Sequence, residues 1–72
     1  MTELQVFVKD YLDTPTRFTN GKHEFCFSMT SEEIVLYSFV KGSCEVVDMV
    51  TWVNTRLNKE LLLGAFKQLT SE

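Results

Sequence analysis

The chain has too few cysteines to be a disulfide scaffold. It contains two Cys, one Pro and three Gly among 72 residues. Secreted domains of this length usually carry more cysteines, because disulfides stabilise a chain that is too short to build a large core. The two thiols, Cys26 and Cys44, therefore favour a reduced, cytoplasmic protein.

Long apolar runs and clusters of basic residues are also absent. No run approaches the ~18 apolar residues of a membrane-spanning helix, and the N-terminus lacks the pattern of a signal peptide. We therefore expect no membrane partner. Seven Lys and Arg stand against ten Asp and Glu, and the net charge is −3. Because phosphate backbones are met by clustered basic residues, nucleic acid is a disfavoured partner.

Residues that carry chemistry are equally scarce. The single histidine, His23, follows a predicted turn, and no serine or cysteine lies in a nucleophile motif. His23 and Cys26 have metal-ligand spacing, but Cys44 has no near partner to complete a four-ligand zinc site. The three glycines stand apart, so no phosphate-binding loop is present. We expect no enzymatic activity, no cofactor and no bound metal.

Apolar residues, in contrast, are plentiful. They make up 44% of the chain and include six Phe, two Tyr and one Trp. Residues 1–72 are enough for a single small domain. A chain of this length buries only ~60% of the surface that it exposes when unfolded. Self-association would cover more of it, so we expect a homodimer.

The segment from Thr2 to Asp13 is predicted to be a helix. Thr2 and Gln5 have capping-box spacing, and the proline two residues after Asp13 prevents continuation. Five apolar residues then share one helical face: Leu4, Phe7, Val8, Tyr11 and Leu12. Val6 lies behind this face. The alternative is a strand that uses the alternation over residues 4–8.

The middle of the chain predicts a three-stranded antiparallel meander. Asn20-Gly21 is a strong hairpin signal, and residues 25–29 alternate apolar and polar side chains. One strand would precede the Asn20-Gly21 turn and residues 25–29 would form the second. Polar residues 30–33 could turn the chain into the third strand, residues 34–40, which is apolar on both faces. A helix capped by Thr30 is the alternative for this last stretch.

The C-terminal part predicts one or two helices. From Ser43 to Leu57 the apolar residues recur at helical spacing, with Ser43 as the cap. Asn58 would end this helix and start another, Lys59 to Leu69; one bent helix is the alternative. The expected fold class is α+β, with an N-terminal helix and the C-terminal helices packed on one face of the sheet. With so few helical residues, we expect the other sheet face to be bare.

This element order is similar to that of double-stranded-RNA-binding domains. In that family a basic motif begins the last helix and meets the phosphates. The matching stretch here, Ser43–Asp48, is acidic, so the resemblance does not transfer the function.

Trp52 is the apolar residue that fits its predicted helix least well. On a helix it would lie opposite the apolar stripe, beside Glu45, Asp48 and Arg56. Leu63 is a similar misfit on the last helix. Trp and Arg are enriched at binding hot spots, and an acidic rim would steer a basic partner.

These misfits lead to the functional hypothesis. We predict a non-enzymatic protein-interaction module, an inhibitor or adaptor of the kind that viruses encode. Its predicted partner-binding residues are Trp52, Arg56, Glu45, Asp48 and Leu63. The alternative is a nucleic-acid-binding domain with a folded basic surface drawn from Lys22, Lys41, Arg56, Lys59 and Lys67.

Overall fold

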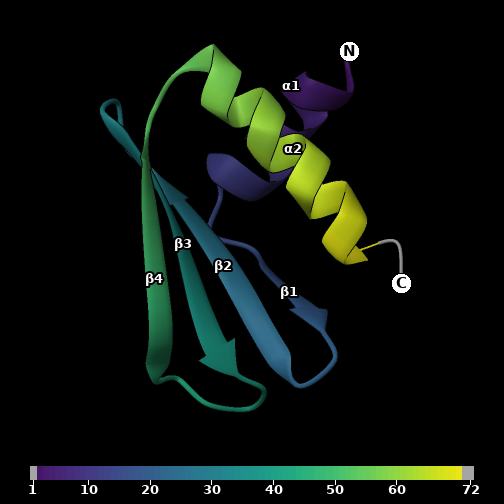
Figure 1. Ribbon diagram of the computed structural model, residues 1–72, viewed down its shortest axis with the longest axis vertical. Helices are drawn as coiled ribbons and strands as arrows, with labels where there is room; N and C mark the ends of the chain where they lie inside the picture. The colour runs from purple at the N-terminus through teal and green to yellow at the C-terminus, as the bar shows by residue number, and fades with distance from the viewer. Residues whose placement is uncertain (1, 71–72) are drawn as a thin grey trace.

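Two layers, one of helices and one of sheet, make up the computed structural model of the chain, which describes residues 2–70 (Figure 1). The elements are α1 (Glu3–Phe7), the π-helix η1 (Val8–Leu12), β1 (Arg17–Asn20), β2 (His23–Met29), β3 (Glu33–Val40), β4 (Val46–Val53) and α2 (Arg56–Thr70). The strands form one antiparallel sheet in the order β1-β2-β3-β4. The predicted α+β class is confirmed, but the sheet has four strands where the sequence predicted three.

The N-terminal helix begins where the sequence predicts. The Thr2 hydroxyl accepts from the Gln5 N–H and the Gln5 side chain returns a bond to Thr2, which completes the capping box. Phe7 and Leu12 on the predicted face are buried. The helix widens into a π-turn over η1, and the strand alternative for this segment is wrong.

The predicted hairpin forms with its turn shifted by one residue. Asn20 pairs with His23, so the two turn residues are Gly21 and Lys22. Only Gly21 has a positive φ, +63°, as the first central position of a type II′ turn requires. The next turn is also confirmed: the Thr30 hydroxyl accepts from the Glu33 N–H at 3.0 Å, and β3 follows in place of a helix.

The segment predicted as a helix from Ser43 to Leu57 is mostly the strand β4, and that prediction is wrong. The Ser43 hydroxyl accepts from the Glu45 N–H, two residues on, which makes a local turn and caps no helix. Five of the eight β4 residues are β-branched, and β-branched side chains favour strands. The pairing of β4 with β3 outweighs the helical spacing.

A single C-terminal helix follows, and it begins at Arg56 where the sequence predicted Lys59. Thr55 is the residue before it, and its hydroxyl accepts from the Asn58 N–H at 3.1 Å. Asn58 therefore lies inside the first turn, and its side chain donates back to the Val53 carbonyl. These bonds fasten the start of α2 to the end of β4.

The core lies between the helices and one face of the sheet. Its most buried members are Phe7, Leu12, Phe27, Ile34 and Leu62. Cross-strand partners point to the same face, and the register aligns Met29, Ile34 and Trp52 across three strands. The helices therefore cover only this face, as predicted.

Candidate interaction surface

The predicted binding residues do not form one helix face. Trp52 lies in β4 on the core side of the sheet, opposite Ile34, and packs partly against the core. Arg56 begins α2 and forms an exposed ion pair with Glu60 at 3.6 Å. Trp52 and Arg56 therefore do not share a helical face, because β4 is extended and α2 begins only at Arg56.

The acidic rim and Leu63 are separated in the same way. Glu45 lies in the loop before β4, and Asp48 lies within the strand, where its carboxylate accepts from the Met49 N–H at 2.8 Å. Leu63 is half-buried on α2 and packs against the core. It also lines a groove of about 300 Å³ between α1 and α2, together with Val6. Val6 and Leu63, the two apolar residues that did not fit their predicted helix faces, thus line the same groove.

A second apolar surface lies on the sheet face that the helices leave bare. The register places Cys26 opposite Tyr37 and Ser28 opposite Val35, so these four residues share this face. We define the open sheet face by its six central residues: Cys26, Val35, Tyr37, Met49, Thr51 and Val53. Its exposure rises toward β4, where Met49 is 58% and Val53 64% exposed.

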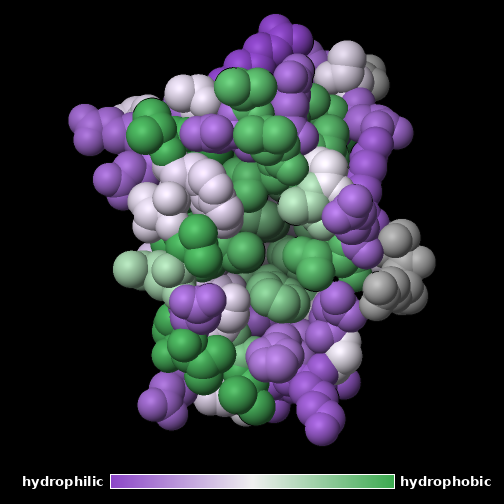
Figure 2. Space-filling model, in the orientation of Figure 1, coloured by the Kyte–Doolittle hydropathy of each residue, from purple (hydrophilic) through white to green (hydrophobic). Residues whose placement is uncertain are grey.

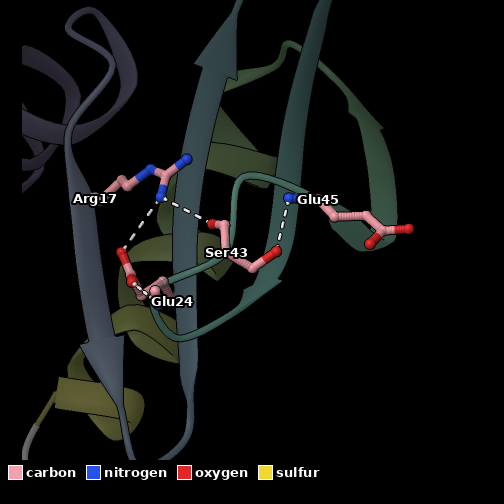
Figure 3. A network of polar contacts seen from close by, with 5 residues as sticks. Arg17, Glu24, Ser43 and Glu45 are labelled. Atoms are coloured by element: carbon pink, nitrogen blue, oxygen red, sulfur yellow. Dashed lines mark hydrogen bonds and ion pairs between the residues drawn. The ribbon is translucent and has the colours of Figure 1, made fainter.

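One end of this bare face is closed by a polar network (Figure 3). The Arg17 guanidinium lies over the Phe39 ring, 4.3 Å from its centre. It also donates to the Glu24 carboxylate and the Ser43 carbonyl, each at 3.4 Å. Glu24 in turn accepts from the Gly42 N–H at 2.8 Å. The loop before β4 is therefore held against the sheet at this end.

The same network lowers the pKa of Glu24 below its ordinary value of 4.5. The Gly42 N–H bond is the largest cause, and the Arg17 bond and charge add to it. A depressed carboxyl pKa contributes stability above 4.5 that is lost as the pH falls through the folded-state value. The side chain is near the surface, so the effect is small.

We expect acid to destabilise the wild-type protein more than the variant Glu24→Gln. The variant lacks the ionised group, so the difference between the two free energies of unfolding should shrink between pH 7 and about pH 3.5. Urea unfolding at both pH values measures this. Glu45→Gln is the control, because Figure 3 shows only a backbone hydrogen bond at Glu45. A difference that stays constant with pH would contradict the assignment.

The outer edge of β4 is the second feature of the surface. The Asn54 N–H bonds the Glu32 carbonyl at 2.9 Å, so this pair is of the hydrogen-bonded kind. In an antiparallel sheet, hydrogen-bonded pairs alternate with pairs that are not hydrogen-bonded. The backbone groups of the even-numbered β4 residues therefore bond to β3. The N–H and C=O groups of Met49, Thr51 and Val53 point away from the sheet.

Apolar side chains are also exposed on the helix side of the molecule. Val50 of β4 is 40% exposed, and Leu57 and Leu61 on α2 are 65% and 63% exposed. Figure 2 shows this side of the molecule, with apolar atoms gathered across its middle between α2 and β4. β4 thus presents apolar groups on both faces, and seven of its eight residues are exposed.

The basic residues do not gather into one surface. The Lys41 N–H bonds the Lys22 carbonyl at the turn end of the sheet, whereas Arg56 and Lys59, with Lys9, line a hollow at the start of α2. Figure 1 places these two regions at opposite ends of the sheet. Lys67 forms an ion pair with Glu3. The nucleic-acid alternative gains no continuous basic patch from this arrangement.

The side chains that could bind a metal or act as nucleophiles are also separated from one another. Cys26 lies on the open sheet face and Cys44 is exposed in a loop, and both are free thiols. Within residues 2–70, no group of three or more His, Cys, Asp or Glu is arranged to hold a metal ion. In the same part of the chain, no helix is long and apolar enough to cross a membrane.

Comparison with known protein families, curated proteins and solved structures gives no match. The surface itself therefore carries the functional argument. The helical spacing of the apolar residues concealed the edge strand β4, which contributes to this surface. The usable signal was the density of β-branched residues in Val46–Val53, which weighs against a helix.

Proposed function

We propose that this protein is a non-enzymatic protein-interaction module, an inhibitor or adaptor of the cytoplasm, that binds another protein through the open sheet face. One observation carries the proposal. The helices cover one face of the sheet, and the other face keeps an apolar centre within reach of solvent. Contiguous apolar patches of this kind mark interaction sites more often than isolated exposed residues do.

The composition of the face supports the same proposal. Tyr37 lies at its centre, between Cys26 and Met49 in the register. Tyrosine is a common hot-spot residue, and methionine adapts to the shape of a partner. The Arg17–Glu24 network holds the border of the face without crossing its centre. An apolar centre with a polar border is the usual anatomy of a protein interface.

We expect Tyr37→Lys to abolish partner capture while the domain stays folded. Lysine would place a charge at the centre of the face, and loss of a central tyrosine typically weakens binding by ~30-fold or more. Tagged wild-type and variant proteins would be compared in capture from a cell lysate. The binding of each retained protein, once purified, would then be measured by calorimetry.

Leu61→Lys is the matched control, because Leu61 is an exposed apolar residue on the opposite, helix side. Circular dichroism would check the fold of both variants. A protein that binds wild type and Leu61→Lys equally, and Tyr37→Lys much more weakly, supports the proposal. Equal binding to all three, or a loss confined to Leu61→Lys, would contradict it.

A further inference from the structure

The edge of β4 has a specific set of unpaired backbone groups. Two of the six outward groups are bonded within the chain: the Met49 N–H to the Asp48 carboxylate, and the Val53 carbonyl to the Asn58 side chain at 2.7 Å. The Thr55 N–H also bonds the Val53 carbonyl. Four outward groups remain: the Met49 C=O, the Thr51 N–H, the Thr51 C=O and the Val53 N–H.

These four groups can bond to the same four groups of a second copy that is related to the first by a twofold axis through Thr51. In an antiparallel pair centred there, the two Thr51 residues exchange both of their bonds. Val53 of each copy then donates to the Met49 carbonyl of the other. The bonds left unmade are those from the Met49 N–H to the Val53 carbonyl, and both of these groups already have partners within their own chain. The edge is therefore complementary to itself in this register.

The side chains agree with the same register. Val50 would lie opposite Trp52 of the second copy, and Thr51 opposite Thr51. Aromatic with β-branched pairs and Thr with Thr pairs are favourable across strands. Asp48, the single charged residue of β4, would lie opposite Asn54, so no like charges meet.

β4 is eight residues long and contains no lysine and no proline, two residue types that keep an edge unpaired. Its one bulge against β3 lies at its first residues, between Val46 and Asp48, so Asp48–Val53 keeps an unbroken register. The other edge strand, β1, has four residues, begins with Arg17 and is contacted by α2. A short, charged and partly covered edge is protected, whereas a long apolar one is a template for pairing.

We infer that two copies of the chain associate through β4, antiparallel and with Thr51 opposite Thr51, to form one continuous eight-stranded sheet. A second copy is favoured over a foreign strand because the bonded and unbonded edge groups are matched to each other. The inference is independent of the proposed function. It leaves the Tyr37 region of each open sheet face available and sets two such regions side by side.

The first test compares lysine substitutions on the two edge strands. Sedimentation equilibrium should show a wild-type dimer. Thr51→Lys would place two cations opposite one another, and we expect the dissociation constant to rise at least ~10-fold. Thr19→Lys on β1 is the control and should leave the dimer unchanged. A wild-type monomer throughout the micromolar range, or equal effects of both substitutions, would overturn the inference.

The second test fixes the register and does not depend on Thr51→Lys being folded. In a Cys26→Ser, Cys44→Ser background, Thr51→Cys should form an intermolecular disulfide, because directly opposite Cα atoms lie about 5.5 Å apart. Met49→Cys would place its thiols four residues out of step, about 13 Å apart, and should cross-link at least ~10-fold more slowly. Faster cross-linking of Met49→Cys, or none by either variant, would overturn the register. Tyr37→Lys should remain dimeric, so failure of the two proposals can be told apart.

Discussion

Replacing Phe27 with alanine is expected to remove most of the stability of this protein. Phe27 is 2% exposed, and its ring contacts those of Phe7 and Phe18, each at 5.7 Å between centres. Removing a buried phenylalanine costs about 3–5 kcal/mol through lost burial and the cavity that remains. A domain of 72 residues has a free energy of unfolding of roughly 5 kcal/mol. Phe27→Ala should therefore be largely unfolded at physiological temperature.

Phe25→Ala provides the comparison. Phe25 lies two residues away on the same sheet face, but it is only half-buried and stacks on Phe18 near the end of the cluster. We expect a loss of about 1–2 kcal/mol, since the truncated side chain was partly in water. Urea unfolding followed by circular dichroism measures both variants. Equal losses would contradict the position of the core.

Val50→Pro is expected to disrupt the sheet, whereas Thr51→Pro should leave the monomer folded. By the alternation of the ladder, the Val50 N–H bonds the Leu36 carbonyl of β3, and the Thr51 N–H points outward. Proline has no N–H to donate, so it is tolerated only where that group faces away from the sheet. Loss of this bond also leaves the Leu36 carbonyl without a partner, and the free energy of unfolding should fall by at least ~2 kcal/mol.

The pair of prolines also tests the assignment of β4 itself. In a helix from Ser43 to Leu57, prolines at 50 and 51 would be equally damaging, because each would remove an interior bond. Thermal unfolding monitored by circular dichroism measures the difference. Similar losses in the two variants would contradict a strand with alternating inward and outward groups. Thr51→Pro should in addition sediment as a monomer.

Local signals predicted the first half of the chain well. The α1 capping box needs only residues three apart, and the β1–β2 turn needs a glycine that accepts positive φ. Each interaction is complete within a few residues. Distant parts of the chain have little influence on it, so the sequence pattern is sufficient.

Periodicity misplaced β4 for a physical reason. An edge strand with apolar groups on both faces has no alternation, and its apolar residues then match helical spacing by coincidence. The hydrogen bonds between β4 and β3 make this segment a strand, and the isolated segment cannot form them. Trp52 consequently lies opposite Ile34 and against the core, and the acidic and apolar residues expected beside it are dispersed.

The α+β class, the N-terminal helix, the first hairpin and an expected bare sheet face could be predicted from the residues, because they follow from short-range chemistry and from the small number of helical residues. That β4 is a strand, which of its backbone groups point outward and which apolar residues share the open sheet face became visible only in the folded chain. Those features depend on the register between β3 and β4. A one-residue change in that register would turn every side chain of β4 to the other face.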